Sequence, residues 1–74
     1  ASAEKAVAQT KKPILIIHGE KDDFVPMRMS RKAYEANPAK IEYHTFPGAE
    51  HGMSYLCDPE RYTGIVKAFL AKHP

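Results

Sequence analysis

Residues 13–19 read PILIIHG, and this stretch decides the fold class of the chain. The four residues from Ile14 to Ile17 are all aliphatic, without the polar–apolar alternation of a strand that has one face in water. A strand can be apolar on both faces only where both faces are covered, which is typical of parallel sheets in α/β proteins. We therefore predict a buried strand that ends at Gly19.

A helix, a second strand and a final helix are predicted after this strand. The first helix is expected from about Met27 to Asn37, where Asn37-Pro38 stops it, and the second strand from Lys40 to Phe46. The final helix begins at Asp58-Pro59, because Asp is a good N-cap acceptor and a proline at the first helical position loses no hydrogen bond. Its apolar stripe follows helical spacing and consists of Tyr62, Ile65, Val66, Phe69 and Leu70.

The order strand, helix, strand, helix indicates two parallel strands joined by a crossover connection. The predicted fold class is therefore α/β, and the chain is expected to form a βαβα segment of a mostly parallel, doubly wound sheet. Residues 1–74 are expected to be a single incomplete domain, in which residues 1–12 form a helical arm or a linker. A buried strand with an open edge needs neighbours, so we expect either a fragment of a larger domain or a homo-oligomer.

The composition excludes several classes of function. With 74 residues, 43% hydrophobic and 27% charged, the chain is typical of a small globular protein. Eleven Lys and Arg against nine Asp and Glu give a net charge of +2, and no basic run is longer than Lys11-Lys12, so neither nucleic acid nor a membrane is an expected partner. The first dozen residues contain no apolar signal core, which favours a cytoplasmic location. Cys57 is the single cysteine, which excludes an internal disulfide.

Two polar loops follow the two predicted strands, and each offers a side chain that can do acid–base chemistry. The loop HGEKDDFVP, residues 18–26, contains Asp22, and the loop FPGAEHG, residues 46–52, contains His51. Catalytic groups in open α/β sheets gather beyond the carboxyl ends of the strands, and neighbouring strands lie roughly 4.8 Å apart. An Asp that accepts from one ring nitrogen of a His leaves the other nitrogen free as a general base. Asp22 and His51 are therefore the candidate catalytic residues.

The pattern Gly19-x-x-Asp22-x-x-Val25-Pro26, followed by His51-Gly52, resembles the C-terminal part of the α/β-hydrolase family over about residues 13–73. The resemblance implies that Asp22 is the acid and His51 the general base of a Ser-His-Asp triad. The enzyme would be similar to serine esterases and to acyl- and dipeptidyl-peptidase-like hydrolases. The implied substrate is a small-molecule carboxylic ester, with amide or peptide bonds second, and the implied mechanism needs no cofactor and no metal.

The nucleophile of that family is missing from this chain. The family's order is Ser, then Asp, then His, with the serine inside Gly-x-Ser-x-Gly at a strand-to-helix elbow. None of Ser2, Ser30 and Ser54 is flanked by glycines in this way. Without a nucleophile and oxyanion donors the chain is not expected to be active alone. Its expected partner is the N-terminal part of the hydrolase domain, on the same chain or on another.

Several residues near the two loops also have simpler structural interpretations. Asp22 can belong to a solvated acidic turn with Asp23, and His51 can be an ordinary surface histidine. His18, at the end of a buried strand, is expected to be structural. A metal site made from His44 and His51 is not expected, because no third ligand sits at a supporting spacing.

The apolar side chains around the loops are expected to pack in the core rather than to line an acyl pocket. They are Phe24, Val25, Met27, Met29, Tyr43 and Met53. Ser54 and Cys57 lie close to His51 in sequence, but neither follows a strand-to-helix elbow, so no substitute nucleophile is expected.

Two other functions stay open beside the enzyme. The chain can be a non-catalytic interaction module that binds a protein partner along its open strand edge, or a fragment that swaps elements into a dimer. A Gly-x-Ser-x-Gly motif upstream favours the enzyme, whereas a natural start near Ala1 favours the module.

Overall fold

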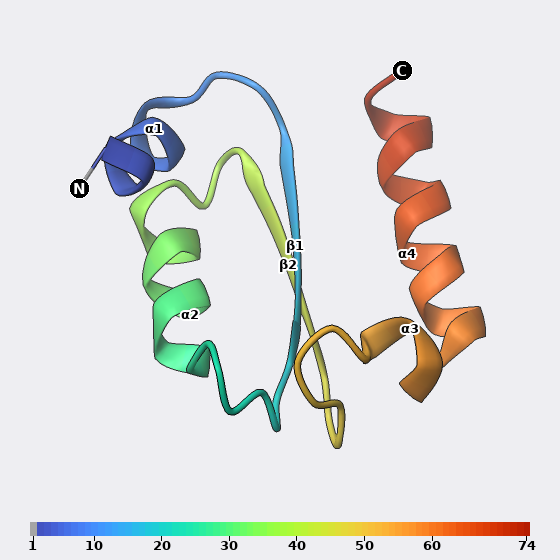
Figure 1. The fold of residues 1–74 in the computed structure, drawn as a ribbon. Helices are drawn as coiled ribbons and strands as arrows, with labels where there is room; N and C mark the ends of the chain where they lie inside the picture. Colours follow the sequence, from blue (N-terminus) through green and yellow to red (C-terminus); the bar gives the residue numbers. More distant parts are fainter. Residues whose placement is uncertain (1) are drawn as a thin grey trace.

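The computed structural model describes residues 2–74, and its helices lie on both sides of a parallel pair of strands (Figure 1). In chain order the elements are α1 (Ser2–Gln9), β1 (Ile14–Gly19), α2 (Met27–Ala36), β2 (Ile41–Phe46), α3 (Ser54–Cys57) and α4 (Pro59–Lys72). The strands pair in register from Ile14 opposite Ile41 to Gly19 opposite Phe46. α1 and α2 lie on one side of the sheet, and α3 and α4 on the other. The α/β arrangement with parallel strands is therefore as predicted.

Local sequence signals explain where the helices begin and end. The side chain of Asp58 accepts a hydrogen bond from the backbone N–H of Arg61 at 3.1 Å, so the predicted N-cap of α4 is confirmed. α2 ends one residue before Asn37. The side-chain amide of Asn37 donates to the carbonyls of Val7 at 3.0 Å and Thr10 at 3.1 Å, which attaches the end of α1 and the segment after it to the end of α2.

The short helix α3 is not predicted from the sequence, because four residues are too few to show a periodic apolar pattern. The backbone N–H of Cys57 donates to the carbonyl of Met53 at 2.9 Å and forms its single turn. Tyr55 then packs edge-to-face on Tyr62 of α4, with ring centroids 5.6 Å apart. α3 thus connects the loop after β2 to the start of α4.

The core of the chain is small. Among residues 5–74, Ile41, Phe46 and Ala49 are the buried apolar residues, and Phe46 is the most deeply buried at 1% exposure. The residues from Ile14 to Ile17, which are expected to be buried, are only half-buried. The physical reason is that, within residues 2–74, β1 has a single strand neighbour and a thin layer of helix on each face.

α4 also shows incomplete burial. Four members of its predicted apolar stripe are half-buried, whereas Leu70 near its end is 58% exposed. Across the part of the chain that the structure describes, each helix is too short or too polar to cross a membrane.

Candidate active site

The loop between β1 and α2 holds Asp22 by its own backbone. Oδ1 of Asp22 accepts hydrogen bonds from the N–H groups of Phe24 and Val25, both at 2.8 Å. A short acidic side chain that bonds the backbone two and three residues further on stabilises a tight turn. Only 6% of the Asp22 side chain is exposed, although the loop lies at the end of the sheet. The turn therefore orients the carboxylate and leaves its second oxygen, Oδ2, available to another group.

Two glycines, Gly48 and Gly52, shape the loop between β2 and α3 on either side of His51. Gly48 has φ +82° and Gly52 has φ +70°, which is backbone that residues with a side chain rarely adopt. The N–H of Ala49 donates to the carbonyl of Phe46 at 3.2 Å, so the chain turns as soon as β2 ends. His51 lies at the outer side of this loop with 52% of its side chain exposed.

The two loops are joined by their backbones at the carboxyl ends of the strands. The N–H of Glu20 donates to the carbonyl of Phe46 at 3.0 Å, and the N–H of Lys21 donates to the carbonyl of Ala49 at 2.9 Å. A Cβ on Gly19 would lie 2.3 Å from the carbonyl oxygen of Ala49, so a residue with a side chain does not fit there. Gly19 therefore permits the close approach that brings the loops together.

Asp22 and His51 form a direct pair across the two loops. Nδ1 of His51 lies 2.8 Å from Oδ2 of Asp22. Because an ionised carboxylate only accepts hydrogen bonds, Nδ1 carries the proton and Nε2 of the neutral ring is the unprotonated nitrogen. In the described part of the chain no hydrogen bond reaches Nε2. The arrangement is that of a histidine held by an acid, with its basic nitrogen available to a further group.

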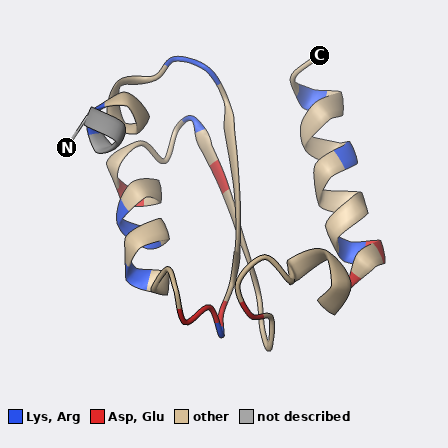
Figure 2. Cartoon of the chain, viewed as in Figure 1, with Lys and Arg blue, Asp and Glu red and all other residues tan. Residues whose placement is uncertain are grey.

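The surroundings of Asp22 keep its carboxylate ionised. Desolvation by the loop raises the pKa of Asp22, but hydrogen bonds from Val25, His51 and Phe24 outweigh it and lower that pKa from 3.8 to about 2. Acidic residues gather at this end of the sheet (Figure 2), and the His51 ring lies closest to Oδ2 of Asp22, at 2.8 Å against 3.4 Å for His18.

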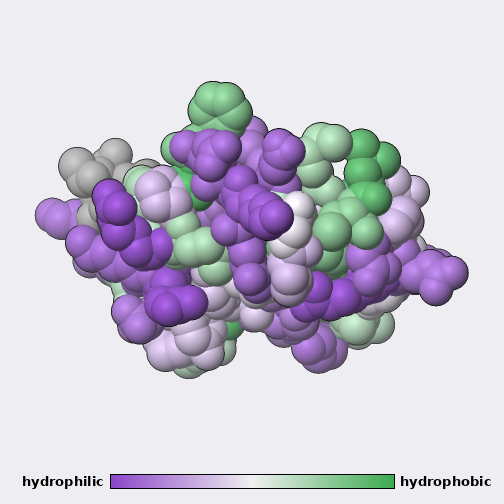
Figure 3. Space-filling view, turned by 90° about the horizontal axis from the view of Figure 1, so that it is seen from below, coloured by the Kyte–Doolittle hydropathy of each residue, from purple (hydrophilic) through white to green (hydrophobic). Residues whose placement is uncertain are grey.

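The aromatic side chain of Phe24 lies against the pair on the outside of the molecule. The ring of Phe24 makes an edge contact with His51 at 5.2 Å between centroids, yet Phe24 is 80% exposed. Seen from this end, hydrophilic residues cross the middle of the surface and apolar residues lie toward its margins (Figure 3). The expectation that the apolar side chains around the loops pack in the core is wrong for Phe24, Val25, Met29 and Met53, which are 80%, 36%, 55% and 42% exposed. The loops lie beyond the ends of the helices, so the described residues do not cover them.

Of the other histidines, His18 lies beside Asp22, with its Nε2 3.4 Å from Oδ2, whereas His44 lies apart from the pair. His18 is buried at 6% exposure, as expected for a structural histidine. Nε2 of His44 hydrogen bonds to Glu42 at 2.7 Å instead of approaching His51. Nζ of Lys72 bonds the same carboxylate at 2.6 Å, and the hydrogen bonds from Lys72 and His44 lower the pKa of Glu42. Within residues 2–74 the structure contains no group of three or more His, Cys, Asp or Glu side chains arranged to hold a metal ion.

Within the described residues, neither Ser54 nor Cys57 is hydrogen bonded to Asp22 or His51. Ser54 begins α3 and is buried at 8% exposure. Cys57 is exposed, and its thiol points to the carbonyl of Pro47 at 3.5 Å.

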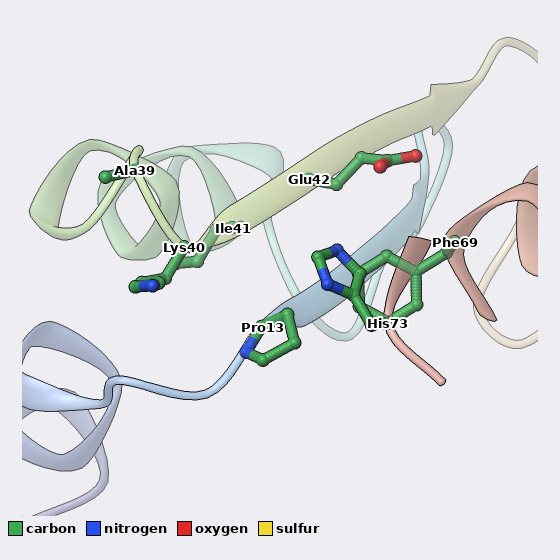
Figure 4. A pocket seen from close by; sticks show the side chains of 7 residues that line it. All are labelled: Pro13, Ala39, Lys40, Ile41, Glu42, Phe69 and His73. Atoms are coloured by element: carbon green, nitrogen blue, oxygen red, sulfur yellow. The ribbon is translucent and has the colours of Figure 1, made fainter. Parts of the chain in front are cut away.

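A hollow of about 220 Å³ lies at the opposite end of the sheet (Figure 4). It is lined by Pro13, Ala39, Lys40, Ile41, Glu42, Phe69 and His73. Ile41 is the first residue of β2, whereas the loop of His51 follows the last, so the hollow is separate from the candidate site.

Comparison with known protein families shows which family the chain belongs to. Residues 1–58 match the model of the serine aminopeptidase S33 family. The chain belongs to this family of α/β-hydrolases. The predicted family resemblance is therefore confirmed, and the matched residues include both loops that form the S33 candidate site.

A curated relative of this S33 family member is the uncharacterized protein YqkD of Bacillus subtilis (strain 168). The two are 30% identical over 64 residues, which are 86% of this chain. The match spans only 21% of the length of that relative.

Proposed function

We propose that this chain supplies the acid and the general base of a serine hydrolase that cleaves carboxylic esters, with amide or peptide bonds second. Asp22 is the acid, His51 is the base, and the nucleophilic serine lies outside these 74 residues. The observation that carries the proposal is the 2.8 Å contact between Nδ1 of His51 and Oδ2 of Asp22, which leaves Nε2 unprotonated on an exposed ring. Membership of the serine aminopeptidase S33 family supports the same chemistry.

The two residues divide the work of proton transfer. Nε2 of His51 takes the proton of the serine as it attacks the ester carbonyl, and later gives that proton to the leaving alcohol. Asp22 stays ionised and stabilises the imidazolium that forms between these steps. Its lowered pKa, about 2, supports this role, because the carboxylate then keeps its charge while His51 is protonated.

The proposal includes a larger hydrolase domain around this chain. β1 and β2 would be two strands of a mostly parallel, doubly wound sheet in the cytoplasm, and the expected partner is the N-terminal part that carries the serine. The half-buried residues from Ile14 to Ile17 support this, because a longer sheet and its helices would cover them.

A fluorophosphonate probe, which reacts only with activated serines, tests the proposal on the complete protein. We expect the protein to gain the mass of one probe, and His51→Ala to lower the rate of ester hydrolysis by about 10²- to 10⁴-fold without unfolding. His44→Ala is the matched control, since it removes another partly exposed histidine of the same strand and loop region.

Two results would contradict the proposal. Turnover near that of the wild type in a folded His51→Ala protein would exclude His51 as the base. A natural product of the size of this chain that takes up no probe would favour an interaction module or a swapped dimer.

A further inference from the structure

His18 is a buried histidine that the proposed function does not use. It lies at the carboxyl end of β1, directly before Gly19, and is 6% exposed. Its Nε2 lies 2.7 Å from the carbonyl oxygen of Val25 and 3.4 Å from Oδ2 of Asp22. One ring nitrogen therefore meets both the acid and the far end of the turn that holds the acid.

The partners of His18 determine which nitrogen carries the proton. A carbonyl oxygen only accepts hydrogen bonds, so Nε2 must donate its proton to Val25. This places an N–H dipole 3.4 Å from Oδ2, the same carboxylate oxygen that accepts from His51 at 2.8 Å. In the neutral ring Nδ1 is then an acceptor.

A chain of hydroxyl groups satisfies that acceptor. Nδ1 of His18 is hydrogen bonded to Oγ of Ser30 in α2, and Oγ of Ser30 is 2.6 Å from the hydroxyl of Tyr43 in β2. With the Ser30 proton directed to Nδ1, the Tyr43 hydroxyl donates to Ser30. Oγ of Ser30 also lies 3.1 Å from the carbonyl of Met27, which is a second acceptor for the single Ser30 proton. The bond to the Val25 carbonyl is therefore the one that requires a proton on Nε2, and the Ser30 and Tyr43 hydroxyls hold the other side of the ring.

The turn at Asp22 ends at Val25, and the backbone carbonyl of Val25 is hydrogen bonded to His18. The N–H of Val25 donates to Oδ1 of Asp22 while its carbonyl accepts from His18. If the Val25 carbonyl loses its donor, the residue rotates more freely and Oδ1 loses one of its two backbone donors. Oδ2 then no longer points reliably at His51.

We propose that His18 is a positioning residue for the Asp22–His51 pair, acting through the hydrogen bond that its Nε2–H donates to the Val25 carbonyl, while Ser30 and Tyr43 hold the other side of the ring. The inference rests on the proposed function of that pair. Its effect is to keep Oδ2 of Asp22 aimed at Nδ1 of His51 without contacting the substrate.

The first test measures the tautomer of His18 by ¹⁵N NMR of the complete, histidine-labelled wild-type protein. We expect Nε2 to be protonated and Nδ1 to be unprotonated. The opposite tautomer would overturn the proposal, because Nε2 could then not donate to Val25. This measurement requires no variant and no activity.

The second test compares two amide substitutions in the same complete protein. The amide nitrogen of His18→Gln reaches the place of Nε2, whereas the shorter side chain of His18→Asn reaches only the place of Nδ1. We expect the NMR signal of the His51 Nδ1–H to persist in the Gln variant and to be lost in the Asn variant. The Asn variant should also lower kcat for ester hydrolysis about 10- to 100-fold, with KM little changed and partial rescue in the Gln variant.

The readouts separate the two proposals. If the wild type hydrolyses no ester but the His51 signal differs between the Gln and Asn variants, the positioning role stands and the proposed function fails. If both variants keep the His51 signal as in the wild type, the positioning role is overturned whatever the activity. Thermal unfolding of both variants confirms that the comparison is made between folded proteins.

Discussion

Asp22 and Asp23 are neighbours in the sequence, but the structure gives their side chains different surroundings. The Asp22 side chain is 6% exposed and accepts two backbone N–H bonds from residues two and three positions later. Asp23 is exposed. Such short-range bonds depend only on the residues of the turn. From the sequence, Asp22 is preferred to Asp23 only because it fits the family pattern Gly19-x-x-Asp22-x-x-Val25-Pro26.

The pH dependence of stability tests the hydrogen bonds to the Asp22 carboxylate. The pKa of Asp22 is about 2 in the folded chain against an ordinary value of 3.8, so the ionised carboxylate stabilises the native state. This contribution is fully present above the ordinary value and is lost as the pH falls through the folded value. The difference in the free energy of unfolding between wild type and Asp22→Asn should therefore shrink as the pH falls from about 4 to about 2.

Chemical denaturation at a series of pH values measures this difference, and Asp23→Asn controls for the loss of one loop charge. A difference that stays constant down to pH 2 would mean that the hydrogen bonds to Asp22 do not favour its ionised form.

The elements meet most closely where β1 ends against the loop after β2. The N–H groups of Glu20 and Lys21, directly after β1, donate to the carbonyls of Phe46 and Ala49, and the missing side chain of Gly19 leaves room for the Ala49 carbonyl. The pairing of Asp22 with His51 depends on this approach, because each residue lies within three positions of a backbone bond that joins the loops.

Substitution of Gly19 by Ala tests whether the fold needs the close approach of the two loops. A Cβ 2.3 Å from a backbone oxygen must push the two loops apart, so Gly19→Ala should destabilise the protein by about 1–3 kcal/mol and weaken the His51 Nδ1–H signal. Gly64→Ala is the matched control, since a Cβ on this residue of α4 meets nothing within 4 Å. It should stabilise the protein by about 0.4–1 kcal/mol, as removing glycine from a helix does. Equal effects of the two variants in chemical denaturation would exclude a special role for Gly19.

The accuracy of the sequence-based prediction differs from element to element. The start of α4 is predicted correctly, because an Asp-Pro pair acts within a single turn. α3 is missed, because a single turn has no period. Phe24 is wrongly expected in the core, since its apolar side chain says nothing about which elements cover it.

At the scale of the whole molecule, Phe46 joins the sheet to α4. It is 1% exposed, its ring lies 6.1 Å from that of Tyr62, and the Arg61 guanidinium sits 4.2 Å from its centroid. Arg61 also donates to the carbonyl of Thr45 at 2.8 Å. These contacts attach the C-terminal helix α4 to the end of β2.

Truncation of the Phe46 side chain should strongly destabilise the folded protein. We expect Phe46→Ala to cost about 3–5 kcal/mol in the free energy of unfolding, because it empties a fully buried aromatic site. Leu70→Ala, on the same side of the sheet but 58% exposed, should cost much less. Denaturant titrations compare the two, and similar losses for both would show that Phe46 does not carry the packing of α4.

The sequence by itself determined the features that depend on a few consecutive residues. These are the aliphatic strand β1, the turn at Asp22 and the capped start of α4, each stabilised by contacts within its own segment. The tertiary structure alone decided that Asp22 and His51, 29 positions apart, lie 2.8 Å from each other, and that His18 meets Val25 and Ser30. Those contacts follow from the parallel register that places Gly19 opposite Phe46, which the packing of strands and helices sets and no local pattern encodes.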